Sequence, residues 1–192
     1  MLIGLMGKSG SGKSQVSLLF KELDNKIQII DVDKIGHMSH KDLKVRKKLQ
    51  KYFGDEIFNE DLSVNRKKLG NIVFSDNAKM QLLYEATYEY MVSMIDKLVK
   101  ESDVAILDYA LLPLTKYYKQ CDVKILVEAT SDVRSGRVMK RDGITFEKYT
   151  LRDANSVDYT LFSFDYVIYN NEDIQILRKT VGEIYEKSIV SR

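Results

Sequence analysis

Short apolar runs alternate along the chain with segments whose apolar residues recur every three or four positions. Five runs have the length and composition of buried strands, at residues 2–6, 27–31, 104–108, 123–127 and 165–169. After the first run, Val16, Leu19, Phe20 and Leu23 keep the spacing of one helical face. Alternating strands and helices are typical of a parallel α/β sheet, which binds ligands at the carboxyl ends of its strands. We therefore predict a single α/β domain over residues 1–192.

Two longer segments interrupt the alternation. Residues 34–102 contain no comparable apolar run, and their spacing predicts helices, one of which Asn65 could cap. Residues 131–154 contain two charged helical segments with a turn at Gly143 between them. We predict an inserted helical lobe in the first segment and a lid in the second.

Composition narrows the class of protein. The hydrophobic share of 44% is that of a globular core, and the net charge of +2 gives no indication of a nucleic-acid or membrane partner. Cys121 is the only cysteine, which excludes an intrachain disulfide and a thiolate metal cluster. The chain opens with a strand rather than a signal peptide, and no apolar run approaches about 18 residues. We expect a cytoplasmic protein; the sequence does not indicate its oligomeric state.

A glycine-rich loop joins the first predicted strand to a helix. Residues 7–14 read Gly-Lys-Ser-Gly-Ser-Gly-Lys-Ser, which fits the P-loop pattern G-x-x-x-x-G-K-[ST] in its required context. In such a loop the backbone N–H groups point at phosphate oxygens, the lysine meets the β- and γ-phosphates, and the final hydroxyl binds Mg²⁺. The nucleotide-binding residues predicted here are Gly10, Ser11, Gly12, Lys13, Ser14 and Gln15.

Aspartates follow two of the other predicted strands. Asp31 and Asp33 end the second, where a carboxylate can accept a proton from an acceptor hydroxyl during phosphoryl transfer. They would share one side if the strand continued; alternatively, either could cap the next helix. Asp108 ends the third strand and could hold Mg²⁺ through water, or serve only as a turn residue.

Arginines gather in the predicted lid. Arg134, Arg137 and Arg141 fall at i, i+3 and i+7, so three guanidinium groups share one helical face. Their forked geometry suits the oxygens of a transferring phosphoryl group, whereas the alternative is a solvated charged face. The basic residues of segment 41–51 have no such companion motif, so we predict a solvated helix face there, with contact to an anionic substrate as the alternative.

A P-loop alone does not define the reaction. A guanine-specific enzyme would carry D-x-x-G after the third strand and N-K-x-D near the fifth. The chain has Asp-Tyr-Ala-Leu at 108–111 and Asn-Asn-Glu-Asp at 170–173 instead. The P-loop, the aspartates and the late arginines together indicate a small-molecule kinase with a closing lid.

The order of the motifs resembles the dephospho-coenzyme A kinase family. After the P-loop come Asp-x-Asp with His37 nearby, Arg-x-x-Leu-x-x-x-Val-Phe at 66–74, Asp-x-x-Leu-Leu at 108–112, Arg-x-x-x-Arg-Asp at 137–142 with Arg152 beyond, and Asp-Tyr-Val-Ile-x-Asn at 165–170. Each motif is weak alone, but their order and spacing are specific and cover nearly the whole chain.

The resemblance implies a three-layer P-loop kinase fold and ATP-dependent phosphorylation of the ribose 3′-hydroxyl of dephospho-coenzyme A, giving coenzyme A and ADP. It implies catalytic roles for Asp33, Lys13, Arg137 and Arg141. It implies acceptor contacts from Asp31, Asp33, His37, Arg66 and Asp108, and ATP contacts from Arg137 and Asn170. Ser14, and Asp108 through water, would hold Mg²⁺.

The chain departs from the family pattern in four places, which bear on the acceptor side. Ala110 replaces a proline, Leu114 a glutamate, the Glu89-Tyr90 pair a His-Pro, and Asn155 a glutamine. Two other functions therefore stay open. One is a kinase for another nucleoside or nucleotide-type acceptor, and the other is a nucleotide-binding module without catalysis.

Overall fold

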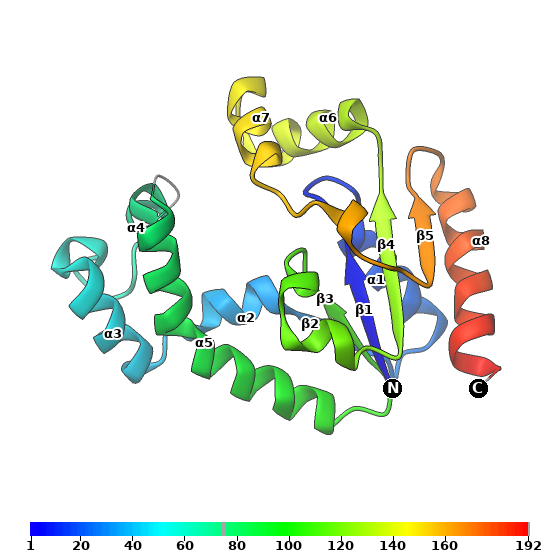
Figure 1. Cartoon of the computed structure of the whole chain (residues 1–192), viewed down its shortest axis with the longest axis horizontal. Helices are drawn as coiled ribbons and strands as arrows, with labels where there is room; N and C mark the ends of the chain where they lie inside the picture. Colours follow the sequence, from blue (N-terminus) through cyan, green and yellow to red (C-terminus); the bar gives the residue numbers. More distant parts are fainter. Residues whose placement is uncertain (74–75, 192) are drawn as a thin grey trace. The chain divides into compact units, whose positions relative to one another are not determined.

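The chain forms two compact units in a computed structural model that describes residues 1–73 and 76–191 (Figure 1). The sheet unit consists of Met1–Asp31 and Leu98–Arg192, and the helical unit of Val32–Lys97. Phe74, the last residue of the 66–74 motif, lies outside the described residues.

The sheet unit is built on five parallel strands in the order β2-β3-β1-β4-β5. The strands are β1 (Leu2–Met6), β2 (Gln28–Asp31), β3 (Ala105–Asp108), β4 (Val123–Glu128) and β5 (Tyr166–Tyr169). This confirms the predicted parallel α/β sheet. The chain leaves the central strand β1 toward β2 on one side and later adds β4 on the other. The loop after β1 therefore lies at the switch point, where ligands bind in such sheets.

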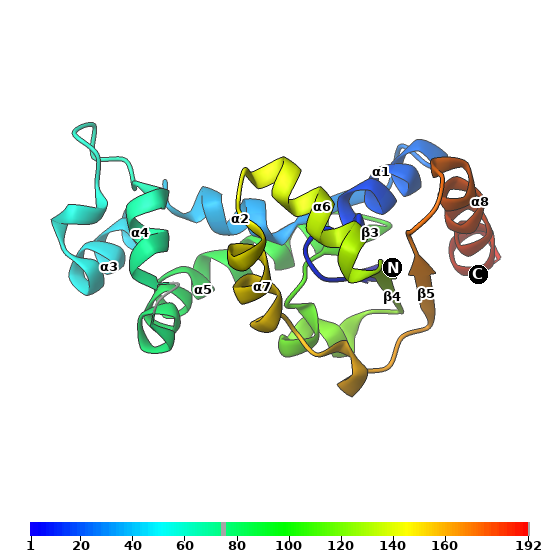
Figure 2. The same cartoon turned by 90° about the horizontal axis from the view of Figure 1, so that it is seen from above.

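Helices cover one face of the sheet. Helices α1 (Lys13–Leu23) and α8 (Ile174–Tyr185) bury Phe20 and Val181 against strand residues such as Ile3 and Ile125. The short helices η2 (Leu112–Leu114), η3 (Lys116–Gln120) and η4 (Tyr159–Leu161) lie toward the other face (Figure 1). The predicted lid consists of α6 (Ser131–Asp142) and α7 (Phe146–Ala154) (Figure 2), and α8 continues into η5 (Glu186–Val190).

The helical unit has its own core. It contains α2 (Val32–Ser39), α3 (Leu43–Phe53), η1 (Asp55–Ile57), α4 (Arg66–Val73) and most of α5 (Asn77–Lys100). Val45, Leu49 and Leu69 are buried in its apolar cluster. The Lys68 N–H donates to Asn65 Oδ1 at 3.0 Å, so the predicted cap of α4 is confirmed.

The structure decides between the two alternatives at Asp33. The second strand does not continue to Asp33, because β2 ends at Asp31 and α2 begins at Val32. Asp33 lies in the first turn of α2, where a carboxylate is favoured by the helix dipole. Asp31 and Asp33 therefore do not share a strand face.

The close contact at Gly4 predicts a stability change. A Cβ at Gly4 would lie 2.8 Å from Cys121 Sγ and 2.8 Å from Leu112 Cδ2, whereas one at Gly182 in α8 would meet no heavy atom within 4 Å. We expect Gly4→Ala to lower the free energy of unfolding by about 1–3 kcal/mol through overpacking. Gly182→Ala should raise it by about 0.5–1 kcal/mol because it improves helix propensity. Urea denaturation checks both changes, and equal effects of the two substitutions would contradict the packing argument.

A histidine in the helical unit predicts a pH effect. Burial, followed by the charges of His37 and Arg66, lowers the pKa of His40 from 6.5 to about 4. The unfolded chain takes up this proton near pH 6.5 but the folded chain does so only near pH 4. The contribution of neutral His40 to the free energy of unfolding is therefore complete above pH 6.5 and is lost as the pH falls from 6.5 to about 4. His40→Gln, compared with wild type by urea denaturation across the window, should reduce the pH dependence; an unchanged slope would show that His40 does not contribute.

Candidate active site

The P-loop (residues 7–14) follows β1 directly and ends in the first turn of α1. Gly12 precedes α1 with φ +96°, a left-handed conformation that favours glycine. A Cβ at Gly12 would lie 2.1 Å from Asn170 Nδ2, so no side chain fits there. Gln15 and Val16 donate their N–H groups to the Gly12 carbonyl, so the helical hydrogen bonds of α1 begin there. The N–H groups of Lys13 and Ser14 precede these bonds, at the positive end of the helix dipole. This end of α1 is suited to bind phosphate.

Side chains from three other elements hold the P-loop in shape. Asn170 Nδ2 donates to the Ser11 carbonyl at 2.8 Å, and Arg137 Nη1 donates to the Gly10 carbonyl at 3.3 Å. The Gly7 N–H donates to the Tyr159 hydroxyl at 3.1 Å, and this hydroxyl donates to the Ala110 carbonyl at 2.7 Å. Tyr159 could not be recognised from the sequence, because a single tyrosine in an irregular segment carries no signal of a partner about 150 residues away.

Lys13 and Asp108 form an ion pair beside the P-loop. Lys13 Nζ lies 3.1 Å from Asp108 Oδ1, and Ser17 Oγ donates to Asp108 Oδ2 at 3.4 Å. Asp108 is only 6% exposed, so its charge depends on these partners. Asp31 occupies the position on β2 that pairs with Asp108 on β3. Two of the predicted aspartates thus lie on adjacent strands at one edge of the sheet.

The arginines of the predicted lid separate into two groups. Arg137 contacts the P-loop backbone, and Arg141 Nη2 donates to Ser9 Oγ at 3.3 Å. Arg141 also forms a forked pair with Asp142, with N–O distances of 2.7 and 2.9 Å. Arg152 Nη1 donates to the same carboxylate at 2.6 Å. Hydrogen bonds from Arg141 and Arg152 lower the pKa of Asp142 to about 2, so this residue is an anion that both arginines share.

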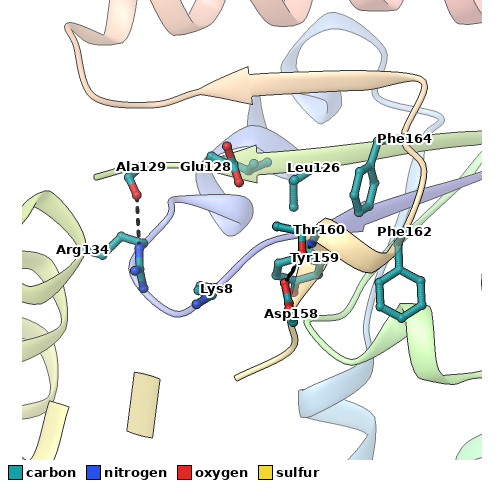
Figure 3. A pocket seen from close by; sticks show the side chains of 11 residues that line it. Lys8, Leu126, Glu128, Ala129, Arg134, Asp158, Tyr159, Thr160, Phe162 and Phe164 are labelled. Atoms are coloured by element: carbon teal, nitrogen blue, oxygen red, sulfur yellow. Dashed lines mark hydrogen bonds between the residues drawn. The ribbon is translucent and has the colours of Figure 1, made fainter. Parts of the chain in front are cut away.

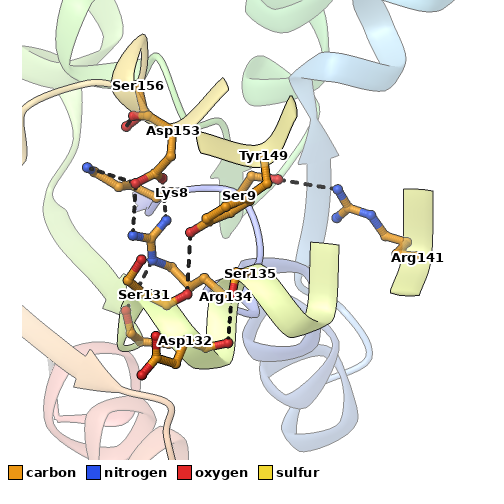
Figure 4. Close-up of polar contacts among 11 residues, drawn as sticks. Lys8, Ser9, Ser131, Asp132, Arg134, Ser135, Arg141, Tyr149, Asp153 and Ser156 are labelled. Carbon is orange, nitrogen blue, oxygen red and sulfur yellow. Dashed lines mark hydrogen bonds and ion pairs between the residues drawn. The ribbon is translucent and has the colours of Figure 1, made fainter. Parts of the chain in front are cut away.

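Arg134 has a different position from the other two arginines of its helical face. It is 7% exposed and binds both carboxylate oxygens of Asp153, which ties α6 to α7 (Figure 4). Its Nε donates to the Ala129 carbonyl at 3.2 Å. The hydrogen bond from Arg134 keeps the pKa of Asp153 below its usual range. Arg134 is therefore an internal support of the predicted lid, whereas the side chains of Arg137 and Arg141 donate hydrogen bonds to the P-loop.

The helical unit contains the other predicted acceptor residues. Asp33 lies in the first turn of α2, His37 in its last turn, and Arg66 at the start of α4. The ring centroids of His37 and His40 are 6.5 Å apart, and the charges of His37 and Arg66 both lower the pKa of His40, after the larger effect of burial. Within this unit, α2 and α4 thus bring His37 and Arg66 toward the same histidine.

The departures from the family pattern have ordinary local roles. Ala110 supplies the carbonyl that Tyr159 binds, and Asn155 Nδ2 donates to the Leu151 carbonyl at 2.9 Å at the end of α7. Leu114 is 67% exposed. In the helical unit, Tyr90 packs against the apolar cluster, and the Glu89 carboxylate lies 3.5 Å from Lys48 Nζ.

Two further observations concern the parts of the chain that the structure describes. Within residues 1–73 and 76–191, no helix combines the length and apolar character that crossing a membrane requires. In the same ranges, His, Cys, Asp and Glu side chains form no group of three or more that could bind a metal ion together.

Comparison with known proteins agrees with this geometry. The family model described as "Dephospho-CoA kinase" matches residues 1–175. A dephospho-CoA kinase of Aquifex aeolicus is 35% identical over 191 residues, which cover 96% of each chain. A Thermus thermophilus protein of known crystal structure superposes with a TM-score of 0.83 at 20% identity over 97% of each chain. A dephospho-CoA kinase from Campylobacter jejuni superposes with a TM-score of 0.68 at 20% identity, over 100% of this chain and 98% of that one. These two likenesses show the shared fold, and the family model and the Aquifex relative show that the chain belongs to the dephospho-CoA kinase family.

Proposed function

We propose that the chain transfers the γ-phosphoryl group of ATP to the ribose 3′-hydroxyl of dephospho-CoA, giving CoA and ADP. One observation supports this proposal most strongly. Arg137 and Arg141 of the predicted lid contact a complete P-loop, and the chain belongs to this kinase family. Phosphoryl transfer depends mainly on positioning and charge stabilisation, and this arrangement supplies cations on both sides of a bound triphosphate.

The P-loop residues bind the nucleotide in this proposal. Backbone N–H groups of the loop and of the first turn of α1 hold the phosphates, with Gln15 in that same turn. Lys13 exchanges its partner Asp108 for the β- and γ-phosphates. Asn170 and Arg137 keep the loop carbonyls turned away from the phosphates, because both side chains bind those carbonyls directly.

The remaining predicted site residues carry out the phosphoryl transfer. The acceptor 3′-oxygen forms a bond to the γ-phosphorus while the bond to the β–γ bridging oxygen breaks, and ADP leaves. Asp33 accepts the proton of the hydroxyl, or orients the hydroxyl for attack. Arg137 and Arg141 neutralise charge on the transferring oxygens. Asp31, His37, Arg66 and Asp108 contact the acceptor.

The residues present also fit Mg²⁺. The Ser14 hydroxyl is exposed in the first turn of α1, and Asp108 supplies a carboxylate one strand away. Mg²⁺ is commonly bound by one or two protein oxygens together with phosphates and water, so a larger acidic cluster is not required. When bound, the ion would neutralise charge on the β- and γ-phosphate oxygens. Ser14 would hold it directly and Asp108 through water.

The proposed chemistry also indicates the cellular compartment. We propose a cytoplasmic enzyme, because its phosphoryl donor is ATP and Cys121 is a free, buried thiol.

An acceptor assay tests the proposal and its alternatives. With Mg-ATP, the purified chain should convert dephospho-CoA to CoA and ADP. Asp33→Asn should lower kcat by about 10²–10⁴-fold, because the group that takes or orients the proton is lost, with the KM for ATP little changed. Lys13→Ala should impair both parameters, because this side chain binds the phosphates. Turnover of another nucleotide acceptor, combined with no turnover of dephospho-CoA, would support a kinase of different acceptor specificity. ATP binding without any turnover, indifferent to Asp33→Asn, would support a non-catalytic module.

Substitution of Arg137 and of Arg134 distinguishes a catalytic arginine from a structural one. Arg137→Ala should lower kcat about 10³-fold, because Arg137 acts on the phosphates. It should lower the Tm less than Arg134→Ala, because its hydrogen bonds to the Gly10 and Ser11 carbonyls are long, at 3.3 and 3.5 Å. Arg134→Ala should lower the free energy of unfolding by about 3 kcal/mol, because it leaves the carboxylate of Asp153 without its forked partner. Thermal denaturation and steady-state kinetics on both variants check this. Equal loss of Tm in the two variants would contradict the assignment.

A further inference from the structure

A cavity lies beside the P-loop in the sheet unit. It encloses about 370 Å³ between Lys8 of the P-loop, the end of β4, the base of α6 and the segment that follows the lid (Figure 3). Lys8 and Arg134 lie toward one end, and the rings of Phe162 and Phe164 lie at the other (Figure 3). The cavity is therefore polar where it meets the P-loop and aromatic away from it.

The charges around this cavity balance. Two cations, Lys8 and Arg134, and two carboxylates, Glu128 and Asp158, line it. Arg134 is already held by Asp153, whose Oδ2 lies 3.9 Å from Lys8 Nζ. The lining therefore has no net positive charge that would favour a polyanion. The lining instead suits an uncharged ligand that donates and accepts hydrogen bonds.

The aromatic end is fixed by its neighbours. The ring of Phe162 meets Tyr118 edge-on at 5.6 Å, and that of Phe164 meets Tyr159 edge-on at 6.1 Å. Tyr159 in turn binds the first residue of the P-loop through its hydroxyl. Rings held in this way form a preorganised apolar wall, which reduces the ordering cost of binding.

The acceptor of the proposed function carries a group with this chemistry. Dephospho-CoA consists of adenosine 5′-diphosphate joined to pantetheine, an uncharged chain with two amides, a hydroxyl group, a geminal dimethyl group and a terminal thiol. Its amides can pair with Lys8, Glu128 and Asp158, and its methyl and methylene groups can lie against Phe162 and Phe164. Pockets for small ligands begin at about 300 Å³, so the cavity suits one such chain.

We propose that this cavity binds the pantetheine arm of the acceptor. The inference rests on the proposed function and extends it, because it assigns a part of the acceptor that does not react to residues outside the catalytic set. The competing occupant is the adenine of ATP, for which aromatic rings would also be suitable.

Kinetics with a complete and a truncated acceptor tests the proposal. Phe162→Ala and Phe164→Ala should each lower kcat/KM for dephospho-CoA by about 10- to 100-fold, the effect of losing one well-packed aromatic contact. For AMP, which has the same ribose but no arm, kcat/KM should not change; if its turnover is too slow, its inhibition constant should not change. Leu161→Ala is the matched control, because Leu161 belongs to the same segment, is 77% exposed and does not line the cavity.

A second measurement does not depend on the variants folding. Pantetheine alone should inhibit the wild-type chain competitively against dephospho-CoA and leave the turnover or binding of AMP unchanged. Equal losses with both acceptors, or no inhibition by pantetheine, would overturn the cavity assignment. A raised KM for ATP in the phenylalanine variants would assign the cavity to the adenine of ATP instead. Absence of dephospho-CoA turnover by the wild-type chain would overturn the proposed function itself, which distinguishes the two failures.

Discussion

The P-loop depends on one constraint, which is that two of its carbonyl groups are bound from outside the loop. Asn170 and Arg137 take the carbonyls of Ser11 and Gly10, so neither carbonyl needs a partner within the loop. Asn170 follows β5, Arg137 belongs to α6, and the loop follows β1, so the sheet and the lid must both be in place before the loop has its shape. The close approach of Asn170 to Gly12 shows how little space remains between them.

The fold could be predicted from sequence wherever burial leaves a periodic signal. Each of the five apolar runs became a strand to within about a residue at its ends, because strands of a covered parallel sheet are apolar throughout. The sequence left two alternatives open at Val32 and Asp33. A β-branched residue followed by an aspartate fits both a strand end and a first helical turn, so local sequence does not decide between them.

The site could be predicted only in part, for a related reason. Lys13 and Ser14 belong to a contiguous motif, and Arg137 and Arg141 follow from helical spacing. Arg134 shares that spacing, yet it is buried against Asp153, which lies 19 residues later and has no motif of its own. Tyr159 was likewise missed, and Asp142, the last residue of the Arg-x-x-x-Arg-Asp motif, was given no role, because the importance of both comes from their partners in space.

The paired cations of the site have a consequence for selectivity between anions. Lys13 lies 3.1 Å from Asp108, and Arg141 shares Asp142 with Arg152, so each of these cations already has a carboxylate partner before any nucleotide arrives. A small anion such as chloride or free phosphate would have to separate an existing pair to gain a single cation. A triphosphate carrying its own metal can meet several cations at once and leave the carboxylates compensated. Under the proposed function, the site would therefore favour a ligand with several closely spaced negative charges over a single simple anion.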